Sequence, residues 1–158
     1  MKKKILITIL CIACLLIACS GESKKAEVPD SQTLLTELKE KSSNVGDIQT
    51  FSAEDDPNEK LGRPGYYISK ADFSDTRLEQ GKSEYLAGGT IETFQNQKDC
   101  DSRAKYLGKL NDSSMGVLAL NQYIYQYDKV LFRVTYDLTQ EQAEEYHTLM
   151  NEIMEQYQ

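Results

Sequence analysis

The first twenty residues constrain this chain most, because they decide which part of it folds as a domain. A basic start from Met1 to Lys4 precedes an apolar run from Ile5 to Ala18, which is broken only by Thr8. This combination, followed by small residues, is the plan of a secretory signal. The run has fourteen residues, whereas a membrane-spanning helix needs roughly 17–25. We therefore expect residues 1–18 to be removed and to take no part in the fold.

The end of this segment, Leu16-Ile17-Ala18-Cys19, resembles a bacterial lipobox. In proteins with that motif the cysteine thiol receives a diacylglycerol, and the lipidated cysteine becomes the first residue of the mature chain. The resemblance implies a membrane anchor at Cys19, with fatty acids such as palmitate, and a polar tether over residues 19–29. The alternatives are an ordinary signal peptide cut at an Ala-x-Ala-like site and an uncleaved transmembrane helix. We favour lipidation over both alternatives. It would place the protein on the extracytoplasmic face of the cell membrane.

Removal of the signal changes the cysteine chemistry and the charge. Cys11 and Cys14 belong to the apolar segment, so we do not interpret their Cys-x-x-Cys spacing as a redox or zinc motif. Cys100 is then the one thiol left beside Cys19, and a single domain over residues 30–158 must depend on its own core. The formal charge changes from −7 to −10, because three lysines and no acid are lost. An acidic surface disfavours nucleic acid as a partner and leaves membrane attachment to the acyl chains.

Residue patterns over 30–158 predict an α+β domain. Asp30 or Ser31 can cap a helix that ends at 42–46, and Thr139 with Gln142 forms a capping box before a last helix. Between them the patterns predict two strands, a helix that begins at Asp99, and a hairpin; the predicted segments are Tyr66–Phe73, Glu84–Phe94, Asp99–Leu110, Val117–Tyr127 and Val130–Asp137. The order α-β-β-α-β-β-α favours a two-layer sandwich, with an antiparallel sheet of about four strands and helices on one face. Gly88-Gly89 indicates a bulge or a close backbone contact.

One stretch resembles the signature of a family of small bacterial lipoproteins. It reads Asp-Pro-Asn-x-x-Leu-Gly-Arg-Pro-Gly-x-Tyr-x-Ser-Lys from Asp56 to Lys70, and it continues with Phe73, Asp75 and Arg77. The resemblance extends over most of the mature chain through Gly88-Gly89-Thr90-Ile91-Glu92-Thr93-Phe94, Asp99, Arg103, Tyr106, Val130-Leu131-Phe132-Arg133, Leu138-Thr139-Gln140-Glu141-Gln142-Ala143 and Tyr146. Cys100 departs from the family, where a small residue such as Ala is expected. The resemblance implies a lipoprotein without a settled activity.

Two groups of side chains are candidate binding surfaces. The first is a basic and aromatic patch suited to a carboxylate or a sugar, made of Arg63, Tyr66, Tyr67, Lys70 and Arg77. Its alternative is a turn set by glycine and proline, with Arg63 paired to a nearby acid. The second is a platform of same-face tyrosines, Tyr123, Tyr125 and Tyr127, whose alternative is ordinary packing on a sheet.

We predict no metal, no cofactor and no catalytic residue. Asp55, Asp56, Asn58 and Glu59 offer oxygen ligands, but the EF-hand spacing is absent and a solvated acidic turn is the simpler interpretation. His147 is the one histidine, and it lies beside the apolar stripe of the last helix. The sequence contains none of the common hydrolase, phosphate-loop or dinucleotide motifs.

These observations favour a non-catalytic binding or interaction module at the cell envelope. Its partner is an envelope protein, a peptide or a glycan. The alternatives are an immunity-like or inhibitory lipoprotein and, less favoured, a hydrolase that uses paired acids on a wall or peptide substrate.

The anchor gives the first testable prediction. Cys19→Ser removes the thiol that would receive the lipid, so we expect the variant to lose acylation and to leave the membrane fraction. Fractionation with mass spectrometry of the N-terminus measures both. A variant that remains in the membrane as a lipidated species would contradict the lipobox interpretation.

Overall fold

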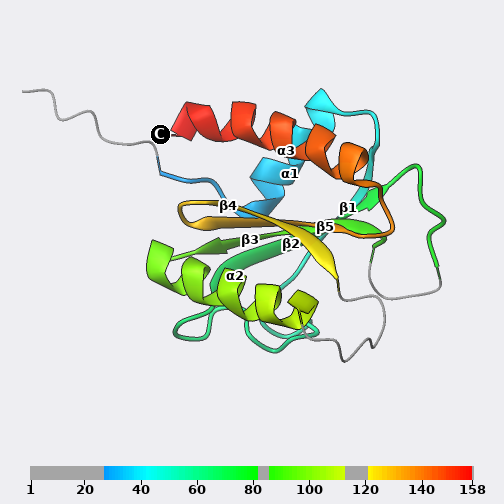
Figure 1. Ribbon diagram of the computed structural model, residues 1–158. Coiled ribbons are helices and arrows are strands. Elements are labelled where there is room, and N and C mark those ends of the chain that lie inside the picture. Colours follow the sequence, from blue (N-terminus) through cyan, green and yellow to red (C-terminus); the bar gives the residue numbers. More distant parts are fainter. Residues whose placement is uncertain (1–26, 82–85, 113–120, 158) are drawn as a thin grey trace, which may run out of the picture.

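The computed structural model of the protein describes residues 27–81, 86–112 and 121–157 (Figure 1). The elements within these ranges are α1 (Ser31–Lys41), β1 (Val45–Thr50), β2 (Tyr67–Asp75), β3 (Gly88–Phe94), α2 (Gln97–Asp112), β4 (Gln122–Tyr127), β5 (Val130–Thr135), α3 (Gln140–Met154) and the 3-10 turn η1 (Glu155–Tyr157). Cys19, the signal segment expected at residues 1–18 and residues 20–26 of the expected tether lie outside them. So do residues 84, 85 and 117–120 of the predicted strands. No helix in the described ranges is both long and apolar enough to cross a bilayer.

The described strands form one antiparallel sheet of five, in the order β1-β2-β3-β5-β4. The predicted α+β class and antiparallel pairing are therefore confirmed, but the order is α-β-β-β-α-β-β-α. The strand that the sequence analysis missed is β1. It lies at the edge of the sheet, has one buried residue, Val45, and pairs with β2 through an irregular register between Val45 and Ile48. Because its apolar and polar residues do not alternate regularly, the sequence pattern did not distinguish this strand from the end of the preceding helix.

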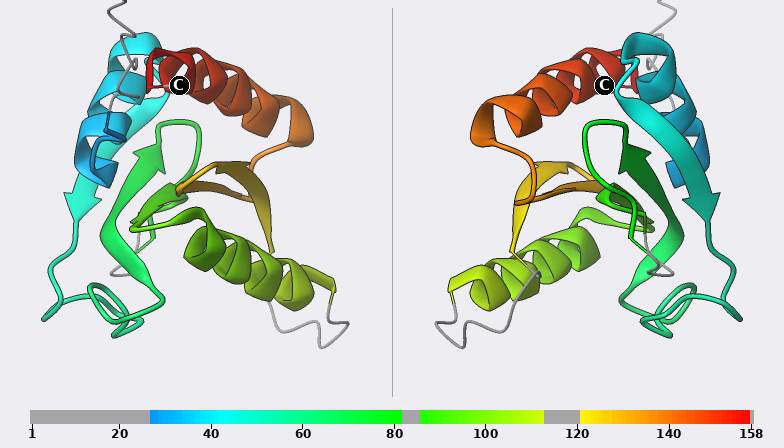
Figure 2. Two further views of the ribbon diagram at one scale, coloured as in Figure 1. Left: turned by 90° about the vertical axis from the view of Figure 1, so that its left-hand side faces the viewer. Right: turned by 90° about the vertical axis from the view of Figure 1, so that its right-hand side faces the viewer.

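Helices cover both faces of the sheet. Figures 1 and 2 show α1 and α3 on one face and α2 on the other. Each face has its own hydrophobic cluster: Phe73, Ile91 and Phe132 pack with α1 and α3, whereas Tyr67, Phe94 and Leu131 pack with Cys100 and Leu107 of α2. The prediction of two layers with helices on one face is therefore wrong, and the domain has three layers. Alternation in β5 sends Val130, Phe132 and Val134 to one face and Leu131 and Arg133 to the other, and all five are buried.

Local signals placed the helix ends well, with one exception. The Asp30 side chain accepts a hydrogen bond from the Thr33 backbone N–H at 2.8 Å, and the capping box of Thr139 and Gln142 is present. Helix α2, however, begins at Gln97, two residues before the predicted cap at Asp99. The Asn96 side chain accepts a hydrogen bond from the Asp99 backbone N–H at 3.0 Å. Asn96, rather than Asp99, therefore caps the helix.

Gly88 and Gly89 allow β3 to lie in the middle of the sheet. A Cβ on Gly89 would overlap the carbonyl oxygen of Arg133 and the ring of Phe73, and one on Gly88 would overlap the backbone of β2. The close backbone contact that this pair indicated is therefore confirmed. It lets β3 place the side chains of Thr90 and Glu92 between β2 and β5.

Candidate functional site

The α2 side of the sheet carries charged side chains in a buried position. Antiparallel register places Lys70 opposite Glu92 and Asp72 opposite Thr90, and it places Arg133 beside Thr90 on the other flank. All five are at most 7% exposed. Burial of a charge is costly unless the charge is paired and hydrogen-bonded. The partners of each buried group therefore determine which charges the site retains.

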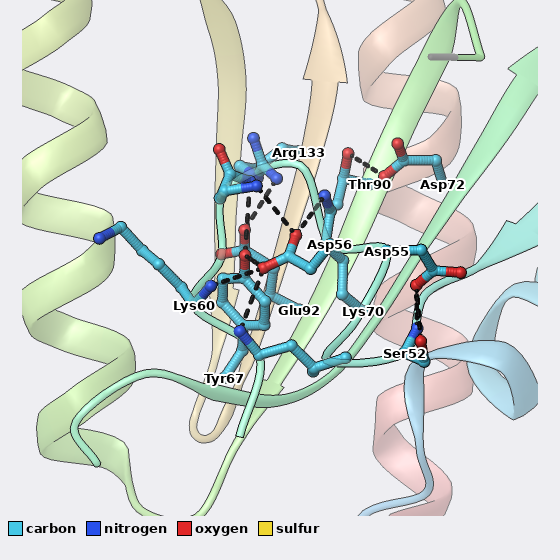
Figure 3. Close-up of polar contacts among 12 residues, drawn as sticks. Ser52, Asp55, Asp56, Lys60, Tyr67, Lys70, Asp72, Thr90, Glu92 and Arg133 are labelled. Atoms are coloured by element: carbon cyan, nitrogen blue, oxygen red, sulfur yellow. Dashed lines mark hydrogen bonds and ion pairs between the residues drawn. The ribbon is translucent and has the colours of Figure 1, made fainter. Parts of the chain in front are cut away.

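Asp56 organises the loop that joins β1 to β2. Figure 3 shows its carboxylate at the centre of a set of donors. The Tyr67 hydroxyl donates at 2.6 Å and the Lys70 ammonium at 3.2 Å. The backbone N–H groups of Lys60 and Leu61 donate at 2.8 and 3.1 Å. The acidic turn expected here is therefore only partly solvated, because Asp56 is 3% exposed and holds the loop from inside.

These contacts shift two pKa values in opposite directions. Burial opposes the charge on Asp56, but donation from Tyr67, from two backbone groups and from Lys70 holds its pKa well below the usual range. Burial and the Asp56 carboxylate raise the pKa of Tyr67. Asp56 therefore stays ionised and Tyr67 stays a donor over the physiological range.

Glu92 is the centre of a second buried group, which joins three elements. Arg103 of α2 binds its carboxylate with two hydrogen bonds, Nε to Oε2 at 3.0 Å and Nη2 to Oε1 at 2.9 Å. Arg133 of β5 donates to Oε1 at 2.9 Å. Burial opposes the charge, but Arg133 and Arg103 lower the pKa of Glu92. Two-point arginine binding fixes geometry as well as charge, so this group holds α2 at a set position over the sheet.

Two buried groups on this side of the sheet, the Asp72 carboxyl and the Arg133 Nε, are incompletely compensated by their neighbours. Burial raises the pKa of Asp72, against the opposing effect of Lys70 and of a 2.7 Å hydrogen bond from Thr90. The Nε of Arg133 has no hydrogen-bond partner in the part of the chain that is described, although Nη1 reaches Gln122 at 2.7 Å.

A cavity opens beside these groups, between the loop that precedes β2 and helix α2. Its volume is about 420 Å³, and its lining consists of Lys60, Pro64, Gly65, Tyr66, Ser102, Arg103 and Tyr106. The Lys60 ammonium lies 4.3 Å from the centroid of the Tyr66 ring. The Arg103 guanidinium lies near two rings, 5.7 Å from the centroid of Tyr67 and 5.8 Å from that of Tyr106. Tyr106 is 53% exposed, so one aromatic wall is open to a ligand.

Chemically, this lining suits binding. The rings offer apolar faces, and the two cations offer charge. The Ser102 hydroxyl donates to the Lys98 carbonyl at 2.9 Å, within its own helix. Among the described residues no three side chains of His, Cys, Asp or Glu are grouped as a metal site. Burial raises the pKa of the Cys100 thiol to about 12, so this thiol is not a reactive thiolate at neutral pH.

The residues of the predicted basic and aromatic patch do not share one surface. Tyr66 lines the cavity, while Tyr67 and Lys70 lie beneath it, buried on Asp56. Arg63 is exposed and lies 3.8 Å from Glu59. Arg77 lies on the α3 side of the sheet, where it pairs with Asp75 and Glu145 at 2.8 Å each.

Of the seven lining residues, only Tyr66 was among the predicted site residues, and the charged and aromatic ones that the sequence did not indicate are Lys60, Arg103 and Tyr106. The available signal was the position of Arg103 and Tyr106 on one helix, three residues apart, where side chains share a face. Both also belong to the stretch that carries the lipoprotein resemblance. What the sequence did not indicate was that the loop containing Lys60 and Tyr66 faces them.

The three tyrosines of β4 pack beneath α3. The Tyr125 ring stacks on His147 with centroids 4.2 Å apart, and the Tyr123 ring lies 4.3 Å from Tyr136. The Tyr127 hydroxyl donates to the His147 carbonyl at 3.3 Å. These contacts support the packing alternative, in which the rings belong to the core and their polar ends find partners.

Comparison with known proteins adds no family to this geometry. The chain matches no family model, and no similar curated protein or solved structure was found.

The Asp56 contacts predict a pH-dependent stability. Asp56→Asn leaves Lys70 buried without its counter-charge, so we expect a loss of about 3–5 kcal/mol in the free energy of unfolding at pH 7. The folded-state pKa of Asp56 is lowered, so its contribution is complete above the unfolded value of about 3.9 and declines as the pH falls. The difference in the free energy of unfolding between wild type and Asp56→Asn should then narrow by about 1.4 kcal/mol per pH unit below about pH 4.

Urea unfolding at pH 7, 4 and 3 measures this difference. The control is Asp55→Asn at the exposed neighbour, which should cost about 1 kcal/mol or less. A wild-type-to-Asn difference that is the same at pH 7 and pH 3 would contradict the assignment.

Proposed function

We propose that the protein is a lipid-anchored, extracytoplasmic binding module that takes a small envelope ligand into the cavity between α2 and the loop before β2. The signal segment and the lipobox resemblance at Cys19 support the location. The resemblance to small lipoproteins agrees with it. The ligand is a fragment of an envelope glycan or peptide.

The observation that carries the binding proposal is that the cavity walls are fixed before any ligand arrives. Asp56 accepts from the backbone N–H of Lys60 and Leu61, which holds the loop wall. Glu92 holds Arg103 through two hydrogen bonds, which holds the helix wall. A site that is ordered in advance loses less conformational entropy on binding.

Size and composition agree with this role. The cavity of about 420 Å³ falls in the range of about 300–1,000 Å³ that is typical of small-molecule sites. Such sites combine apolar and aromatic walls with a few placed polar groups, and Tyr66, Tyr106, Lys60 and Arg103 supply both kinds here.

The test uses soluble fragments of digested bacterial cell wall as the probe. Full-length protein in detergent is incubated with the digest, separated from free fragments, and analysed by mass spectrometry for retained glycans and peptides. Tyr106→Ala removes one aromatic wall, so we expect affinity for the retained fragments to fall by about 2- to 12-fold, the equivalent of 0.5–1.5 kcal/mol.

Tyr136→Ala is the matched control. Tyr136 is 49% exposed, close to the 53% of Tyr106, but its ring packs at a tilt against Tyr123 and is not part of the cavity lining. It should retain the fragments as wild type does. If wild type retains nothing, or if both variants lose retention equally, the proposal is wrong.

A further inference from the structure

We infer that the cavity recognises its ligand through a carboxylate carried on a body with a flat apolar face. This inference rests on the proposed binding function and names the ligand class for that same site. Three observations carry it: the charge of the lining, the unused donor of Arg103, and the two tyrosine rings of the lining.

The lining is cationic in a chain that is acidic overall. The sequence has a formal charge of −7, yet the cavity is lined by Lys60 and Arg103 and by no acidic side chain. No carboxylate in the described ranges pairs with the Lys60 ammonium, whose contact is the Tyr66 ring. The cavity therefore attracts an anion where most of the surface repels one.

Beneath the lining, two arginines share one carboxylate. Glu92 is bound by Arg103 and Arg133, both at 2.9 Å, Lys70 is paired with Asp56, and the buried Asp72 carboxyl lies in the same layer, opposite Thr90. The attraction for an anion in the cavity therefore comes from the two lining cations, Lys60 and Arg103, in a site partly shielded from water.

Arg103 also has a donor to spare. Its Nε and Nη2 are used on Glu92, and Nη1 forms no hydrogen bond with any residue in the described part of the chain. The guanidinium is already fixed near the Tyr67 and Tyr106 rings, so little side-chain entropy remains to be lost. Arginine and lysine donors favour carboxylate oxygens, and such charge-assisted bonds are about twice as strong as neutral ones.

The rings define the rest of the ligand. Tyr66, which is half-buried, lines the cavity from the loop, and Tyr106, which is 53% exposed, lines it from α2. A flat apolar face beside the carboxylate would pack on them. Two sources supply this chemistry, an acidic sugar ring and the C-terminal end of a peptide.

Titrations followed by NMR of backbone amides distinguish the sources. The probes are D-glucuronate against D-glucose, and N-acetyl-dialanine against its C-terminal amide, added to the full chain in detergent. We expect at least one carboxylate to shift the amides of residues 65, 66 and 102–106 and to bind about tenfold or more tightly than its neutral counterpart, because hydrogen bonds to charged groups contribute about 1.5–3 kcal/mol. The arm that responds identifies the source.

Lys60→Gln should weaken carboxylate binding about five- to tenfold and reduce its dependence on salt. Lys105→Gln removes the same charge from an exposed position on α2 outside the lining and should bind as wild type does. Both sites are on the surface, so the variants should fold. The inference is overturned if no carboxylate binds, if neutral counterparts bind as tightly, or if the two lysine variants behave alike.

These outcomes separate the ligand class from the proposed function. Equal binding of charged and neutral probes, with wall fragments still retained, removes the carboxylate claim and leaves the binding module. Failure of both the probes and the wall fragments removes both.

Discussion

The structure depends on the burial of one carboxylate. Glu92 lies in the central strand of the sheet with no exposed surface, and it is stable there because arginines from α2 and β5 donate to it. A buried ion pair is weak evidence for net stability, since desolvation offsets much of the attraction. Its value here is geometric. It specifies where the helix sits on the sheet, and a hydrophobic contact of the same area would do this less sharply.

Two such buried acids, acting on different segments, produce the cavity. Asp56 folds the loop before β2 by accepting from its backbone, and Glu92 positions Arg103 on α2. The loop and the helix then face each other across a space that neither fills. The opposite face of the sheet is mainly apolar. There Phe73, Phe132 and Tyr146 form an aromatic cluster under α1 and α3, which gives the domain its apolar core without a disulfide.

The sequence predicted what depends on neighbouring residues. The cap at Asp30, the capping box at Thr139, and the hairpin with its tip at Asp128-Lys129 all follow from local patterns, and the structure contains them. It did not predict β1, whose edge position needs no apolar alternation, or the face on which α2 lies. Of the candidate site, Tyr66 was named. Its partners Lys60, Arg103 and Tyr106 were not, because their meeting depends on buried ion pairs that join the loop and α2 to strands whose order the sequence does not reveal.

The central claim, that the Glu92 group holds α2 over the sheet, is tested most directly by a double-mutant cycle. Glu92→Gln and Arg103→Gln, alone and together, give a coupling energy from urea unfolding at pH 7, and the exposed pair of Lys41 and Glu152, at a similar 3.0 Å, gives the reference. We expect a coupling energy of about 2 kcal/mol or more for the buried pair, against about 0.2–1 kcal/mol for the exposed pair. Equal coupling energies for the two pairs would contradict the claim.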